Sequence, residues 1–417
     1  MTARPIINAM DESRVLVDAV GAVWPEEPGP EEAAIESALV DALRELDSAG
    51  PDEVESAQDR VLAVLGEAPG LHRRVESAIL AALLGAERGV GAPQSPGVTE
   101  RRSEVEIAYA TDRAPTPAPD GFYGRSRDRT LRCGRAWVAL PDDHRIGRLP
   151  RPKRRWRLRF RKPGDAGLRL EESESLTATV SGMRDRAPGR DVLVFVHGYN
   201  VSFVDAVRRT AQLAYDVDFG GVPVLYSWPS AGSPAAYVAD GAAADGTQRR
   251  FRTFLTSLME STDGGRVHVI AHSMGNRILT EALSGLTGYE LGHVVFAAPD
   301  LDSEQFRDRV ADFSGTAERY TLYVNDRDLA LAASGSHVLA NAPRAGEGGI
   351  DDVVFDGIDT IDASRVETGL LGHSYAMERR TVVSDIHLLI HHDHPPDKRP
   401  GLGLMMSRNG PYWEFRP

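Results

Sequence analysis

The stretch VHVIAHSMGNRILTEAL, from Val267 to Leu283, decides the fold. It begins as a short apolar run, which is typical of a buried strand, and resumes after a serine with apolar residues three and four positions apart, which is helical spacing. Between the two parts stands A-H-S-M-G, residues 271–275. This matches the G-x-S-x-G nucleophile elbow, with alanine in place of the first glycine. The sequence therefore predicts that Ser273 is a nucleophile in a strained turn, with its hydroxyl exposed.

The sequence around this stretch alternates between apolar runs and amphipathic segments. Strands apolar on both faces that alternate with helices are typical of a parallel sheet covered on both sides. The predicted fold class is therefore α/β, with a mostly parallel sheet flanked by helices. Predicted strands cover 191–198, 222–230, 267–272, 293–302 and 320–328, and predicted helices cover 201–217, 246–262 and 274–286.

The chain is predicted to have a separate helical module before this core, which spans 185–417. Residues 1–90 are acidic and carry segments such as EEAAIESALVDALREL, with apolar residues at helical spacing. Residues 91–100 are rich in Gly and Pro and predict a linker. Two interpretations of the module stay open: a bundle that packs or spaces, and a docking domain for a protein partner.

Residues 101–184 are predicted to be a β-rich part of the same α/β domain, from patterns such as EVEIAYATDR and GRAWVALP. Within it, residues 144–162 are densely basic, and Trp156, Leu158 and Phe160 alternate with arginines. This alternation predicts an edge strand with its arginines outward. A patch for phosphates or anionic lipid is the alternative.

Composition excludes several classes of protein. The 417 residues carry a formal net charge of -13, which argues against non-specific nucleic-acid binding. The single cysteine, Cys133, allows no intramolecular disulfide. We find no apolar run of about 18 residues and no secretory signal, so we expect no membrane-spanning helix and a cytoplasmic location.

A serine hydroxyl becomes a good nucleophile when a base takes its proton and a carboxylate fixes the tautomer of that base. In folds with this elbow the chain order is serine, acid, histidine. The strand after the elbow that ends near 324 is followed by Asp326 and Asp328. We expect Asp328 to be the acid, with Asp326 next. Asp300 and Asp302, in AAPDLD, are the reserve candidates.

The expected base is His373, in the glycine-flanked loop GLLGHSY. His197, which precedes Gly198, is expected to hold its loop by hydrogen bonds. The tract HHDH at 391–394 resembles a metal-binding tract but has no second ligand cluster, so we expect a solvated tail, with no metal and no cofactor. The other downstream candidates for the base are His337, His387, His391, His392 and His394.

The oxyanion of an acyl-transfer intermediate needs two backbone donors. The N–H of Met274, at the start of the helix, is the expected first donor. The N–H of Tyr199 is the expected second, with Asn200 as the alternative. The acidic stretch 332–371 is expected to be a lid loop. For three aromatic residues two interpretations stay open: they line an acyl pocket, or they pack under a loop. These aromatic residues are Tyr226, Trp228 and Tyr237.

Several motifs together resemble a bacterial family of α/β-hydrolase-fold proteins that is described as a domain of unknown function and grouped with esterases and lipases. The motifs are AYATDRAP, FVHGYN, SWPSAGS, HVIAHSMGNR, AAPDLD, TLYVNDRDLAL, TIDASRV, LLGHSY and PYWEFRP, which span roughly residues 105–417. The resemblance implies a serine nucleophile at Ser273, an acid at Asp328 and a histidine at His373.

The predicted function is a serine hydrolase that cleaves a small-molecule or lipid acyl ester through an acyl-enzyme. Two alternatives stay open. One is a non-catalytic binding or scaffold protein on the same fold, since a fold alone does not imply chemistry. The other is a hydrolase effector controlled by the helical module at 1–90, which would then bind a protein partner.

Overall fold

The chain divides into two compact units, residues 1–95 and 96–417. The division falls within the predicted linker at 91–100. In the first unit the described residues are helical, and Ile35, Leu39 and Ala42 are buried at helical spacing. The computed structural model describes residues 35, 37–42, 64, 103–116, 122–141, 144–147, 149, 168–231, 237–326, 328, 331, 343–347, 350–366, 377 and 379–416.

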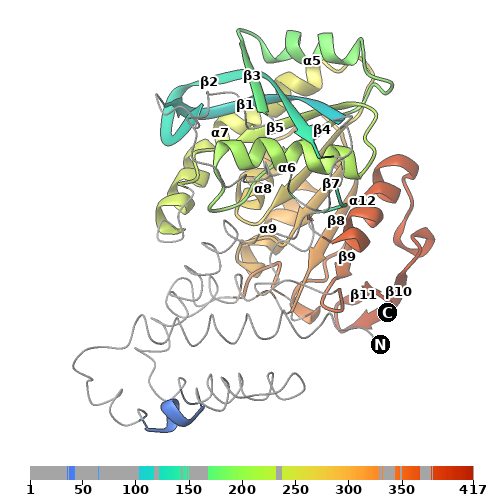
Figure 1. The fold of residues 1–417 in the computed structure, drawn as a ribbon. Coiled ribbons are helices and arrows are strands. Elements are labelled where there is room, and N and C mark those ends of the chain that lie inside the picture. Colours follow the sequence, from blue (N-terminus) through green and yellow to red (C-terminus); the bar gives the residue numbers. More distant parts are fainter. Residues whose placement is uncertain are drawn as a thin grey trace, which may run out of the picture. The chain divides into compact units, whose positions relative to one another are not determined.

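An 11-stranded sheet runs through the second unit in the order β10-β11-β9-β8-β7-β6-β4-β5-β1-β2-β3 (Figure 1). From β11 to β1 all neighbours are parallel, and the antiparallel pairs are β10 with β11, β1 with β2 and β2 with β3. The strands are β1 Ser103–Pro115, β2 Tyr123–Leu140, β3 Leu168–Ser173, β4 Val192–Val196, β5 Val222–Ser227, β6 Val267–His272, β7 Leu291–Ala297, β8 Ala317–Val324, β9 Ile358–Asp362, β10 Leu402–Ser407 and β11 Gly410–Phe415. The predicted α/β class is confirmed.

Helices cover both faces of this sheet. Helices α5, α7, α8 and α9 contribute buried residues to one apolar cluster, and α6 and α12 contribute to the other. Both faces need cover because side chains alternate along a strand and both faces of the central strand β4 are apolar. Val194 and Val196 belong to the first cluster, whereas Leu193 and Phe195 belong to the second. The helices are α5 Leu176–Arg184, α6 Phe203–Asp216, α7 Tyr237–Glu260, α8 Gly275–Ser284, α9 Ser303–Phe313 and α12 Arg380–His392, with short 3₁₀ turns at Ile350–Asp352 and Pro396–Lys398.

Two sequence expectations need correction. The stretch 332–371 is not one long loop, because it contains the parallel strand β9, whose Ile358 and Thr360 are buried against β8. The edge strand expected within 144–162 lies almost wholly outside the described residues. The residues described there, 144–147 and 149, form a loop rather than a strand, and His144 Nε2 lies 2.6 Å from Asp216.

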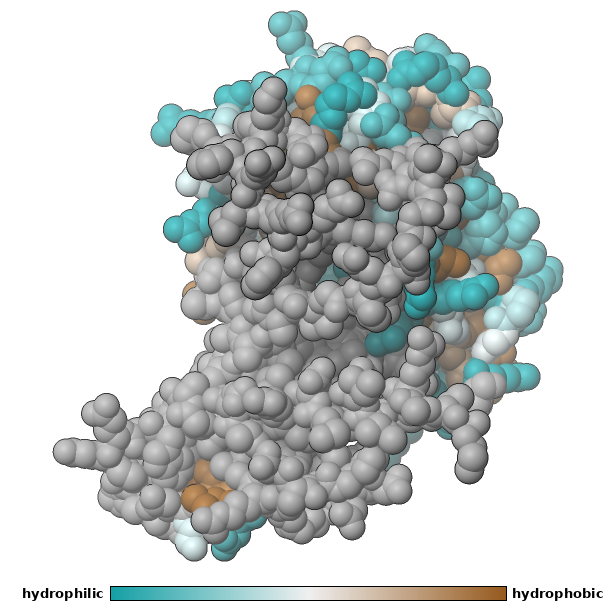
Figure 2. Space-filling model, viewed as in Figure 1, coloured by the Kyte–Doolittle hydropathy of each residue, from teal (hydrophilic) through white to brown (hydrophobic). Residues whose placement is uncertain are grey.

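The outer strands β2 and β3 carry a mixed-charge surface, and this side of the second unit is mostly hydrophilic (Figure 2). Arg135 lies 3.4 Å from Glu106 and 2.7 Å from Glu171, and Arg132 lies 3.0 Å from Asp128. Charged side chains near the edge of a sheet discourage pairing with another chain. None of the described helices is long and apolar enough to cross a membrane.

Two histidines stack in the core near the amino-terminal ends of β6 and β7, at the opposite edge of the sheet from Ser273. The ring centroids of His268 and His293 are 4.9 Å apart, and both side chains are fully buried. His268 Nδ1 accepts a 2.9 Å hydrogen bond from the N–H of His293. Burial lowers the pKa of His293 to about 3, and the nearby His268 acts in the same direction.

We expect His293 to make the fold sensitive to acid. An unfolded histidine takes up a proton near pH 6.5, whereas folded His293 stays neutral down to about pH 3. The stability it contributes is therefore present above pH 6.5 and is lost as the pH falls toward 3. Between pH 7 and pH 5 the loss amounts to about 2 kcal/mol.

Urea denaturation at pH 7 and pH 5 measures this effect. In His293→Phe, which keeps an aromatic ring against His268, the free energy of unfolding should fall by about 2 kcal/mol less over that interval than in the wild type. An equal fall in both proteins would contradict the assignment.

Candidate active site

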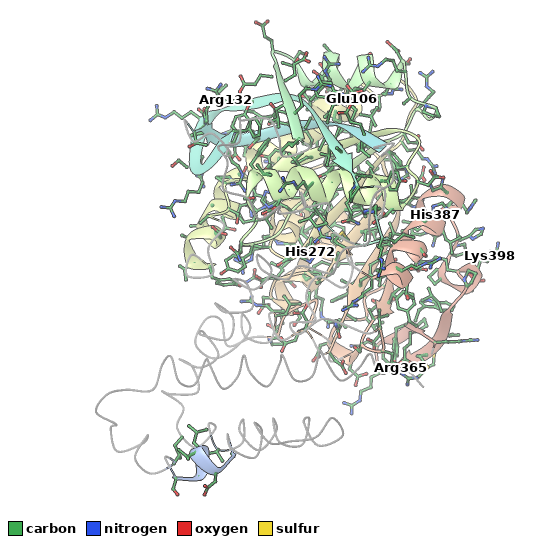
Figure 3. The ribbon with its side chains drawn as sticks, viewed as in Figure 1. Glu106, Arg132, His272, Arg365, His387 and Lys398 are labelled. Atoms are coloured by element: carbon green, nitrogen blue, oxygen red, sulfur yellow. The ribbon has the colours of Figure 1, made fainter. Side chains whose placement is uncertain are left out.

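Ser273 occupies a sharp turn between β6 and α8, close to His272 at the centre of the second unit (Figure 3). Its φ of 52° lies in the left-handed region, which is costly for a residue other than glycine. The N–H of Ser273 donates to the carbonyl of Ala297 at 2.9 Å, and its own carbonyl accepts from the N–H groups of Asn276 at 3.0 Å and Asp300 at 3.2 Å. The turn is therefore fixed by the end of the neighbouring strand β7.

The small residues around the serine are required by close contacts. A Cβ on Gly275 would lie 2.6 Å from the carbonyl oxygen of His197, and one on Gly198 would lie 2.7 Å from the Cβ of Ser273. The loop after β4 therefore rests directly against the elbow. As a result Ser273 is only 3% exposed, and the freely exposed hydroxyl expected from the sequence is not found.

His197 holds the loop after β4, as the sequence suggests. The ring is buried, stacks on Trp228 with centroids 5.1 Å apart, and places Nδ1 2.8 Å from the carbonyl oxygen of Gly198. Its Nε2 lies 3.2 Å from Ser227 Oγ. Burial lowers the pKa of His197 well below its usual value, and the nearby Arg113 acts in the same direction, so the ring is neutral with its proton on Nδ1.

Four candidate acids follow β7 and β8, and they differ in burial. Asp328 is 1% exposed, and its Oδ1 accepts a 3.0 Å hydrogen bond from the N–H of Leu331. Asp326 is exposed. Asp302 caps α9 by accepting from the N–H groups of Glu304 and Gln305, the second and third residues of that helix, at 3.0 Å each. These environments favour Asp328 as the acid. Asp326 is exposed to solvent, and the carboxylate of Asp302 is used to cap a helix.

Asp300, the remaining candidate, lies in a buried polar cluster beside the elbow. Its two carboxylate oxygens lie 3.0 and 2.8 Å from the hydroxyl of Tyr237, and Arg344 Nε lies 3.3 Å from Oδ1. Arg277 donates from Nε to its carbonyl at 2.8 Å. Because its backbone N–H also contacts Ser273, this cluster ties the elbow to α7 and α8. Sequence reasoning found Asp300 but gave no signal for Arg344.

His373, the expected base, lies outside the described residues, as does His337. The two predicted oxyanion donors lie in the described part. Met274 is fully buried at the N-cap of α8, where the first N–H groups of a helix have no intrahelical acceptor. Tyr199 lies in the loop after β4, with its ring 5.4 Å from that of Tyr237.

The aromatic candidates divide between packing and lining. Trp228 and Tyr226 are fully buried; Trp228 Nε1 donates to the carbonyl of His197 at 2.7 Å, and the hydroxyl of Tyr226 lies 2.7 Å from Thr247 Oγ1. Both pack beneath the site. Tyr237 is only partly buried, and its hydroxyl contacts Asp300 beside the elbow, so of the three it alone remains a candidate for contact with an acyl group.

The histidine tract is solvated as expected, since residues 391–393 are exposed, but it begins as the end of a helix and is not a tail. His391 and His392 are the last residues of α12. His391 Nε2 and His387 Nδ1 lie 2.9 and 2.8 Å from the carbonyl oxygen of Val217, at the end of α6. His387 lies on this helix, well apart from His272 (Figure 3). Among the described residues, no group of three or more histidine, cysteine or acidic side chains is arranged to hold a metal ion.

A parallel sheet with helices on both faces and a serine in a strand–turn–helix elbow defines an α/β hydrolase by fold. Residues 172–392 match the family described as alpha/beta hydrolase of unknown function (DUF900), and the chain belongs to this family. The family resemblance seen in the sequence motifs is confirmed.

Among solved structures, 29 chains match this one. One is a Trichoderma reesei cutinase in complex with a phosphonate inhibitor, at 13% identity and a TM-score of 0.23, covering 51% of this chain and 83% of that one. Another is a mutant of the esterase rPPE, at 13% identity and a TM-score of 0.28, covering 75% of this chain and 90% of that one. These structural similarities are too weak to support a statement about activity. No curated protein matches the chain.

Proposed function

We propose that the protein is a serine hydrolase that cleaves carboxylic esters through an acyl-enzyme on Ser273. The observation that carries this proposal is the left-handed turn at Ser273, held by the end of β7 and by the loop after β4. Strain in a non-glycine residue persists only where its surroundings fix it, and such residues cluster at functional sites. A scaffold protein has no need for this conformation, so the turn favours the enzyme over the non-catalytic alternative.

In the proposed reaction the Oγ of Ser273 attacks the acyl carbonyl while His373 takes its proton. Asp328 orients the imidazole and stabilises its positive charge. The N–H groups of Met274 and Tyr199 hold the oxyanion of the tetrahedral intermediate. His373 then protonates the departing alcohol, which leaves the acyl group on Ser273. Water, deprotonated by His373, attacks this acyl-enzyme, releases the carboxylic acid and regenerates the serine.

The proposed substrate is a small-molecule or lipid acyl ester. Ser273 is 3% exposed and Tyr237 contacts Asp300 beside the elbow, so we expect the length of the acyl chain to limit turnover. Turnover of p-nitrophenyl esters with acyl chains of increasing length will show how much space is available.

A fluorophosphonate probe tests the proposal directly, because it phosphonylates only an activated serine. We expect stoichiometric labelling of the folded protein at pH 7.5, with the adduct on Ser273 in tandem mass spectra of the peptide that carries it. Heat-denatured protein, in which the elbow is lost, should not react. Absence of an adduct on the folded protein, or an adduct on another residue, would refute the proposal.

A further inference from the structure

A buried arginine contacts the loop that faces Ser273. Arg113, near the end of β1, is 1% exposed. It belongs to the motif AYATDR, which the mechanism above leaves without a role. Its Nη2 donates to the carbonyl of Val201 at 2.8 Å, in the loop after β4. The same guanidinium donates to four further groups: Ser227 Oγ at 2.9 Å, the carbonyl of Ser230 at 2.9 Å, the carbonyl of Gly124 at 3.2 Å and His197 Nε2 at 3.4 Å.

A buried carboxylate holds the same loop from the other side. Asp240, in the first turn of α7, is 1% exposed, and its Oδ2 accepts from the backbone N–H of Asn200 at 3.3 Å. Its Oδ2 also accepts from Ser230 Oγ at 2.6 Å, and that hydroxyl in turn accepts from the N–H of Val201 at 3.1 Å. The backbone of residues 200 and 201 is therefore fixed by two charged side chains joined through Ser230.

Burying these two charged side chains costs stability, and this cost is understandable if they fix the geometry of the loop. Each buried charge loses several kcal/mol of hydration, and apolar side chains of similar volume often stabilise a fold as well or better. Burial lowers the pKa of Arg113 to about 10, and Asp240 acts in the opposite direction, so the guanidinium is still charged at neutral pH. A planar guanidinium presents five donors in a rigid fork, a geometry that neither an ammonium nor an apolar side chain provides.

We propose that Arg113 and Asp240 are positioning residues that hold the loop of residues 198–201 by its last two residues, so that the backbone N–H of Tyr199 faces the oxyanion formed at Ser273. The inference rests on the proposed function. It follows from two contacts: the loop lies against the elbow, where a Cβ on Gly198 would be 2.7 Å from that of Ser273, and its next residues are bonded to the two buried charges. Donors fixed in advance need no reorganisation when the oxyanion forms.

Arg113→Lys tests the proposal, because lysine keeps the charge and loses the fork of donors. We expect kcat for a short p-nitrophenyl ester to fall about 10- to 100-fold, with KM changed by less than about threefold, since the donors act in the transition state. The Ki of a trifluoromethyl ketone, which forms a tetrahedral adduct with an oxyanion, should rise in proportion. Hydrogen exchange should become faster in peptides that cover 198–202.

Two further variants complete the test. Ser230→Ala removes the hydroxyl that links the loop to Asp240. The change is small, so we expect this variant to fold and to show the same changes to a lesser degree. Arg250→Lys is the matched control: Arg250 lies 3.0 Å from Asp112, the neighbour of Arg113 on β1, and none of its described contacts reaches the loop. It should leave kcat, Ki and exchange at 198–202 unchanged, even if the free energy of unfolding falls.

The outcomes separate this inference from the proposed function. Unchanged exchange or unchanged kcat in folded Arg113→Lys would overturn the positioning role, and Ser230→Ala decides in the same way if the lysine variant does not fold. If the wild type gives no adduct on Ser273, the proposed function fails instead. The exchange measurement then still decides whether the two buried charges hold the loop.

Discussion

Ser273→Ala is expected to abolish ester turnover, lowering kcat about 10⁶-fold and removing the fluorophosphonate adduct. The size of the effect follows from the mechanism: without Oγ no acyl-enzyme forms, and only direct attack by water within the site remains. The fold should be unaffected, because the contacts that fix the turn use the backbone N–H and carbonyl of Ser273 and not its hydroxyl. Alanine tolerates the left-handed φ about as well as serine.

A matched control separates this effect from general disturbance of α8. Ser284, the last residue of that helix, donates from Oγ to the carbonyl of Thr280 at 3.1 Å and lies at the end remote from the elbow. Ser284→Ala should keep full turnover. Turnover in Ser273→Ala within tenfold of the wild type, in a preparation free of contaminating esterase, would show that another residue is the nucleophile.

The architecture was predictable because its signals are local. The apolar run of β4 alternates between two clusters, and the A-H-S-M-G turn needs small residues where backbone atoms approach within 3 Å of a would-be Cβ. The strand β9 was missed because it has only five residues and lies inside an acidic stretch. The tract at 391–394 is solvated as expected, since residues 391–393 are exposed, but it is not a tail, because two of its residues end α12 and one bonds to the end of α6.

The site was predictable in part. The serine and the acids follow strands whose carboxyl ends must meet at one edge of a parallel sheet, so their proximity follows from the fold class. The polar network around them does not follow from the fold class. Arg113 contacts groups 84 to 117 residues further along the chain, and Asp300 pairs with Arg344, which lies beyond both α9 and β8 in the sequence. In the sequence, an Asp-Arg pair near a strand end looks like a solvated turn, and only the folded structure shows it buried.

Asp328→Asn should lower kcat about 10⁴-fold, because an amide neither fixes the productive tautomer of His373 nor stabilises its positive charge. The turn itself should survive, since the amide oxygen of asparagine can accept the hydrogen bond that Asp328 Oδ1 accepts from the N–H of Leu331. Ester turnover, with circular dichroism as the check on folding, measures the effect.

Asp326→Asn is the matched control, two residues away on the same turn and exposed. It should change kcat less than about twofold. Asp300→Asn discriminates the remaining candidate. Because Asp300 contacts Arg344 and Tyr237, its loss should lower the free energy of unfolding and loosen the elbow, with a smaller fall in kcat than for Asp328. If Asp300→Asn instead shows the 10⁴-fold loss in a stable fold while Asp328→Asn stays active, the acid follows β7, and the triad extends from the neighbouring strand end rather than from the next one along the sheet.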